Sequence, residues 1–243
     1  MKWSVHPGGY LWVKNRLQPL DPESVQYQEA HSGLFREFSE TPRTREGIQS
    51  FANRHGACFA SYILFDEWRH QIDDMQQVVW LWDAVLRRKR HLLREVIRWD
   101  SPTRVSYYRD GKFNRVIADE YHPQIIDQLR HGKQLKPATW LVLRMVNEKI
   151  TRPSQSFGHL VDELRVNTQL TWDFDNDSSP VIEFGSDTLA GEMWLQAARW
   201  ISSGYEYIPC QSCGTWFLNK PKPGPAQKYC SKACRTRAWR ESK

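Results

Sequence analysis

Four cysteines near the end of this sequence constrain its fold more than any other feature. They form two close pairs, Cys210-Gln-Ser-Cys213 and Cys230-Ser-Lys-Ala-Cys234, with sixteen residues between the pairs. This spacing is typical of a structural zinc site, in which a tight turn brings two thiolates to one ion and a second pair completes the tetrahedron. Four thiolates leave no open coordination position. We therefore expect one structural Zn²⁺ ion, held by Cys210, Cys213, Cys230 and Cys234.

The residues around the pairs fit that interpretation. Gly214 suits the unusual dihedral angles of a knuckle turn after the first pair. Cys230 and Cys234 are four residues apart, so the first turn of a helix starting near Tyr229 would present both to the metal. Two disulfides are the alternative. The start of the chain argues against them, because Pro7, Gly8 and Gly9 interrupt its apolar stretch and no secretory signal is evident.

The excess positive charge lies in the same segment as these cysteines. From Cys210 to the end, eight cations and one acid give +7, whereas the whole chain is +6, which leaves −1 on residues 1–209. Four thiolates and one Zn²⁺ would lower the segment to about +5. A basic segment beside a near-neutral body suggests a localised polyanion contact, although a solvated tail would have the same charge.

The candidate phosphate contacts are cations in the loop between the pairs and in the final helix. On that helix Lys232, Arg235 and Trp239 form a stripe roughly opposite the cysteine face. Trp239 could stack on a base, but we favour its packing on the N-terminal domain. Trp216, Phe217 and Tyr229 are the expected mini-core of the small module. The predicted nucleic-acid-binding residues are Lys220, Lys222, Lys228, Lys232, Arg235, Arg237 and Arg240.

These motifs carry a resemblance over about 35 residues. The patterns Cys-x-x-Cys-Gly-x-Trp-Phe and Lys-Tyr-Cys-Ser-x-x-Cys-Arg-x-Arg-Ala-Trp-Arg resemble the C-terminal zinc finger of bacterial CGNR-type proteins. The fourth cysteine is followed by Arg-Thr-Arg rather than Gly-Asn-Arg. The resemblance implies a treble-clef-like finger in a DNA-binding transcription regulator. The segment Thr44–Gly56 is similar to one in bacterial proteins that end in this finger, with no activity assigned.

The body of the chain reads as α+β, mostly helical. Apolar residues recur at helical spacing over 65–98, so we predict one amphipathic helix there, with the basic run Arg87–His91 spread around its surface. Asp110-Gly111 predicts a hairpin between 104–108 and 112–118. Further predictions are a helix over 137–150, strand periodicity over 160–174, and a helix capped by Asp187 that ends at Gly204. The predicted domains are 1–204 and 205–243, and the many tryptophans are best explained by packing.

No catalytic signature is evident, so we expect no enzymatic activity. Arg115 and His122 faintly resemble the Arg…His motif of HEPN-type ribonucleases. Cys58 near His55 could mimic a nucleophile and base, but a small buried thiol is the better interpretation.

The sequence therefore predicts a cytoplasmic, zinc-binding, DNA-binding transcription regulator. Its partner would be double-stranded DNA, with no membrane association, and the N-terminal domain would sense a ligand or form a homodimer. A protein-interaction or purely structural finger is the first alternative. A nuclease or toxin-like activity in the N-terminal domain is the second, and a convergence of His, Arg and carboxylate groups would favour it.

Overall fold

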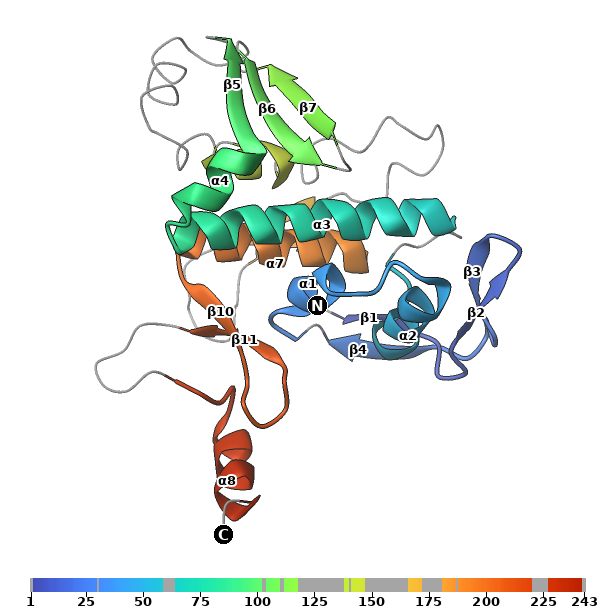
Figure 1. Ribbon diagram of the computed structural model, residues 1–243. Coiled ribbons are helices and arrows are strands. Elements are labelled where there is room, and N and C mark those ends of the chain that lie inside the picture. The colour runs from blue at the N-terminus through green and yellow to red at the C-terminus, as the bar shows by residue number, and fades with distance from the viewer. Residues whose placement is uncertain are drawn as a thin grey trace. The chain divides into compact units, whose positions relative to one another are not determined.

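A computed structural model confirms the α+β class, with helices and small antiparallel sheets (Figure 1). It describes residues 2–29, 31–58, 64–101, 104–109, 112–117, 138–139, 141–146, 166–171, 181–186, 188–219 and 227–241. Two compact units are present, one formed by 1–76 with 147–243 and one by 77–146. The division of the chain near residue 204 into separately folding domains stays a prediction.

The first unit begins with two small antiparallel ribbons followed by two helices. β1 (Lys2–Val5) pairs with β4 (Gln26–Glu29), and β2 (Tyr10–Val13) pairs with β3 (Arg16–Pro19). After α1 (Leu34–Ser39), Thr44 caps α2 (Arg45–His55) by accepting a hydrogen bond from the N–H of Gly47. The indole of Trp3 donates to the carbonyl of His55 at 2.7 Å, which ties the end of α2 to β1.

An aromatic core holds this unit together. Phe38 lies between the rings of Phe51 and Trp68, with ring centroids 5.2 and 6.3 Å away. Trp194 and Trp200 of α7 (Leu189–Ser203) are also fully buried. Burial of such large rings is the main stabilising term in a core of this kind. The prediction that tryptophans serve packing is confirmed for these three, although Trp80 is 40% and Trp239 59% exposed.

The single helix predicted over 65–98 is wrong. α3 (Phe65–Leu86) ends in a Schellman motif, in which the N–H of Lys89 donates to the carbonyl of Ala84 and that of Arg88 to Val85. Arg88 takes the left-handed φ of +51° that this motif requires. The first three residues of the basic run, 87–89, therefore form an exposed turn, and its last two begin α4 (Arg90–Val96), so the run is exposed but does not spread around one helix.

The rest of the second unit contains the predicted hairpin. β6 (Arg104–Arg109) and β7 (Lys112–Ile117) pair with Arg109 opposite Lys112, as the Asp-Gly pair indicates. β5 (Ile97–Ser101) is the third strand, and the prediction that its first two residues form the end of a helix is wrong. The predicted helix over 137–150 is confirmed where it is described, at 138–139 and 141–146.

The remaining elements return to the first unit. β8 (Val166–Thr171) pairs with β9 (Val181–Ser186), which confirms the strand periodicity where residues are described. α7 ends at Gly204 with a φ of +65°, as predicted, but its cap is Thr188 and not Asp187. The Thr188 hydroxyl accepts from the N–H of Gly191, so it occupies the capping position. None of the helices described is both long and apolar enough to cross a bilayer.

Candidate metal centre

The first cysteine pair lies in the turn of a β-hairpin. β10 (Glu206–Pro209) and β11 (Trp216–Asn219) are antiparallel, with Pro209 opposite Trp216 (Figure 1). Between them the N–H of Cys210 donates to the carbonyl of Thr215 at 3.0 Å, and that of Gly214 to Cys210 at 2.9 Å. Gly214 has a φ of +74°, which confirms the predicted knuckle.

The second pair lies at the start of α8 (Lys232–Glu241). The helix begins three residues later than predicted because Ser231 is its N-cap. The Ser231 hydroxyl accepts from the N–H of Cys234 at 3.2 Å, and its carbonyl accepts from Arg235 at 3.2 Å. Cys230 therefore precedes the helix, while Cys234 lies in its first turn.

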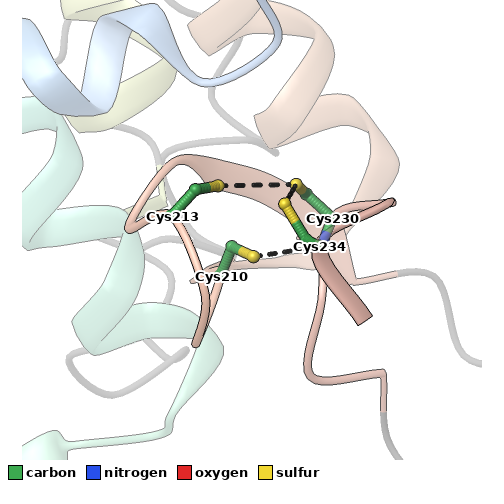
Figure 2. A group of neighbouring side chains, drawn as sticks. All are labelled: Cys210, Cys213, Cys230 and Cys234. Atoms are coloured by element: carbon green, nitrogen blue, oxygen red, sulfur yellow. Dashed lines mark hydrogen bonds between the residues drawn. The ribbon is translucent and has the colours of Figure 1, made fainter. Parts of the chain in front are cut away.

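These two elements bring four sulfur atoms together (Figure 2). All four lie within 4.8 Å of one another, with 3.7 Å from Cys213 to Cys230 and 3.5 Å from Cys230 to Cys234. Zinc–sulfur bonds of about 2.3 Å in a tetrahedron place neighbouring sulfurs about 3.8 Å apart. A disulfide would need about 2.05 Å, and all four cysteines are free. The arrangement fits one zinc ion and not two disulfides.

The hydrogen bonds and pKa values around the sulfurs fit the same conclusion. Desolvation raises the pKa of Cys210, but N–H groups of Cys230, Ser212 and Cys213 outweigh it and lower that pKa to about 6. Hydrogen bonds from Thr215 lower the pKa of Cys213. Desolvation and the neighbouring sulfurs raise the pKa of Cys230 to about 12. A divalent cation is what allows all four sulfurs to be thiolates together.

Four sulfurs complete the coordination shell, as expected of a structural site, with Cys213 exposed and Cys230 half-buried. Cys210 and Cys234 are buried and pack with Phe217, and Ile208 and Tyr229 lie against this cluster. The N–H of Gln211 donates to the carbonyl of Lys228, which ties the knuckle to the segment before α8. Four sulfurs around one ion leave no position for a substrate. The chain thus carries a zinc-binding site formed by these four cysteines.

Trp216 is not part of the mini-core, contrary to the prediction. Successive residues of a strand point to opposite faces, so Trp216 and Phe217 cannot both face the sulfurs. The indole of Trp216 instead donates to the Glu40 carboxylate at 3.1 Å, and its ring lies 5.1 Å from the guanidinium carbon of Arg36. Arg36 is buried and also lies 4.2 Å from the Trp200 ring. The sequence gives no sign of this cation–aromatic stack, which joins β11 to α1 and α7.

The predicted nucleic-acid-binding cations lie on the outside of the finger where they are described. Lys228, Lys232, Arg235, Arg237 and Arg240 are all exposed, whereas Lys220 and Lys222 lie outside the described residues. Cys234 is the buried residue of α8. Trp239 is 59% exposed, so the predicted packing of this ring on the N-terminal domain is wrong.

Two residue pairs in the sequence resemble catalytic pairs, Cys58 with His55 and Arg115 with His122, and the structure tests only the first. Cys58 is fully buried and desolvation raises its pKa, as expected of a packing thiol and not of a nucleophile. His122 lies outside the described residues, so its pairing with Arg115 stays untested.

A second group of side chains that could hold a metal ion consists of His31, Glu37 and His55. The sequence reasoning missed it. These residues are separated by 6 and 18 positions, so no local spacing motif reveals them.

Comparisons with protein families, curated proteins and solved structures find no match to this chain.

Proposed function

We propose that this zinc-binding protein is a DNA-binding transcription regulator that contacts double-stranded DNA through the outer face of α8. The observation that carries the proposal is that the metal ligand and the cations of this helix lie on different faces. Cys234 is buried towards the sulfur cluster, while Lys232, Arg235 and Arg240 are exposed on the remaining surface. The proposal assigns the chain no catalytic activity.

Helix geometry explains why these cations can act together. At 100° per residue, Lys232, Arg235 and Arg240 span about 140° of the helix circumference, and Trp239 lies within that arc. Such an arc can follow a phosphate backbone, with each contact releasing counterions. Lys228 and Arg237 lie outside this arc and are exposed as well. The motif resemblance to CGNR-type fingers also supports the proposal.

The first test is the salt dependence of binding to a random-sequence duplex, followed by fluorescence anisotropy. Three phosphate contacts predict an affinity loss of about 40-fold between about 50 and 200 mM salt. Replacing two of them, in Lys232→Ala with Arg235→Ala, should weaken binding and reduce that loss to about 4-fold. The matched control removes two exposed cations elsewhere, Arg16→Ala with Arg69→Ala, and should bind as the wild type does.

The result also separates DNA binding from its main alternative. Trp239 is 59% exposed at the outer face of α8, and an exposed tryptophan also suits a protein contact. If no duplex binds at about 50 mM salt, the DNA proposal is wrong and the finger is a protein-interaction or structural module. Equal salt dependence in the double variant and its control would contradict the assignment of α8.

A further inference from the structure

The His31, Glu37 and His55 cluster brings two imidazoles to one carboxylate within the first unit. Glu37 lies in α1, and its Oε2 is 3.1 Å from Nε2 of His55, the last residue of α2. Its other oxygen, Oε1, is 3.4 Å from Nε2 of His31, which precedes α1. The three ligand atoms lie within 4.8 Å of one another.

The distances fit a shared metal ion. Metal–ligand bonds of about 2.1 Å at tetrahedral angles place neighbouring ligand atoms about 3.4 Å apart. Each imidazole nitrogen lies close to that distance from one carboxylate oxygen, His55 at 3.1 Å from Oε2 and His31 at 3.4 Å from Oε1. Hydrogen bonds within the cluster could give the same distances, so the argument needs a feature that a hydrogen-bonded cluster does not explain.

His31 supplies that feature. Both of its ring nitrogens lie near acceptors, Nδ1 at 3.3 Å from the carbonyl of Ser32 and Nε2 at 3.4 Å from a carboxylate oxygen of Glu37. A neutral imidazole has one N–H, so it can donate to only one of them, and the lone pair of its other nitrogen then faces an acceptor. Either a second proton on the ring or a cation between the two atoms removes the repulsion. A histidine that donates one nitrogen to a backbone carbonyl is oriented as metal ligands are.

The surroundings hold the ligands in place and leave one side open. The backbone carbonyl of His31 accepts from Gln196, and that of His55 accepts from Trp3. The side chain of His55 is 9% exposed, that of Glu37 22% and that of His31 31%. The cluster is therefore buried at His55 and reaches solvent at His31.

Arg54 carries a positive charge close to Glu37, which disfavours the binding of a cation to this cluster. Its Nη1 lies 3.8 Å from Oε2 of Glu37, and its side chain is 60% exposed. At that exposure the guanidinium can move into water, and the ion pair contributes little. It would nevertheless weaken the binding of any cation to this carboxylate.

We propose that His31, Glu37 and His55 form a second metal site, for one divalent transition ion such as Zn²⁺ or Co²⁺. Two imidazoles and one carboxylate suit borderline ions of this kind, whereas Mg²⁺ and Ca²⁺ prefer oxygen ligands. Three protein ligands leave a coordination position open to solvent, unlike the closed site of four cysteines. The proposal does not depend on DNA binding.

Metal stoichiometry of the full chain tests the site. Native mass spectrometry during titration with Zn²⁺ should give two ions per chain in the wild type and one in His31→Ala. Cys213→Ser should lose the finger's ion and keep the other. His70→Ala is the matched control, because His70 is an exposed histidine whose Nδ1 also lies near a backbone carbonyl, and it should still bind two ions.

Two further readouts keep the proposal testable if His31→Ala folds poorly. With Co²⁺, one equivalent should give thiolate charge-transfer bands and the other only weak d–d bands, the latter absent in His31→Ala. Arg54→Ala should bind the second ion about five-fold tighter, because a nearby unit charge is removed. Saturation of the wild type at one ion, or a Co²⁺ titration with no second set of bands, would overturn the proposal and leave a cluster held together by hydrogen bonds.

Discussion

The cap of α8 gives a direct prediction for zinc affinity. The Ser231 hydroxyl accepts from the N–H of Cys234 at 3.2 Å, so it orders the turn that places this ligand. Removing an N-cap hydroxyl costs about 1 kcal/mol. Because zinc binding and folding of such a module are coupled, this loss appears as weaker zinc binding. Ser231→Ala should therefore bind zinc about five-fold more weakly than the wild type.

The assay is competition between Zn²⁺ and Co²⁺, followed by the thiolate charge-transfer band, which reports only on the cysteine site. Ser231→Thr keeps a hydroxyl at the cap and should bind zinc within about two-fold of the wild type. Ser202→Ala is a control for loss of an exposed helical hydroxyl, which donates to the carbonyl of Arg199. Unchanged affinity in Ser231→Ala, or an equal loss in Ser231→Thr, would refute the reasoning.

Three other side chains give further predictions. Trp216→Ala should destabilise the protein by about 2 kcal/mol and lower Tm by roughly 4–8 °C, because the buried guanidinium of Arg36 loses its contact with the Trp216 ring. Trp216→Phe keeps an aromatic ring there and should keep most of the stability. Gly33→Ala should cost at least about 2 kcal/mol in denaturant unfolding, since φ is +96° and the new Cβ would lie 2.6 Å from the Trp216 carbonyl oxygen. Cys58, which is fully buried, should resist alkylation in the native protein and react on unfolding, and rapid native labelling would contradict that burial.

The sequence predicts the zinc ligands well because their signal is local. The turn residue Gly214 and the spacing within each pair fix how the thiolates meet, whatever the rest of the chain does. The Asp-Gly hairpin and the end of α7 at Gly204 are predictable for the same reason. Each depends on the preferences of a few neighbouring residues.

The errors arise where the neighbouring residues carry no signal of the structure. α3 ends at Leu86 although the apolar pattern continues, because Arg88 takes a left-handed conformation usually reserved for glycine. Trp216 joins the aromatic stack on Arg36, a contact across 180 positions. The two histidines that flank Glu37 come from either side of α1 in the sequence and meet only in the folded unit.

The ligand set of the bound zinc tests the central claim most directly. X-ray absorption at the zinc edge, measured on His31→Ala so that only the finger binds metal, should give four sulfur ligands at about 2.3 Å. Cys234→Ser should change that shell or remove the ion. A shell dominated by nitrogen or oxygen, or no bound zinc in His31→Ala, would contradict the assignment of the four cysteines.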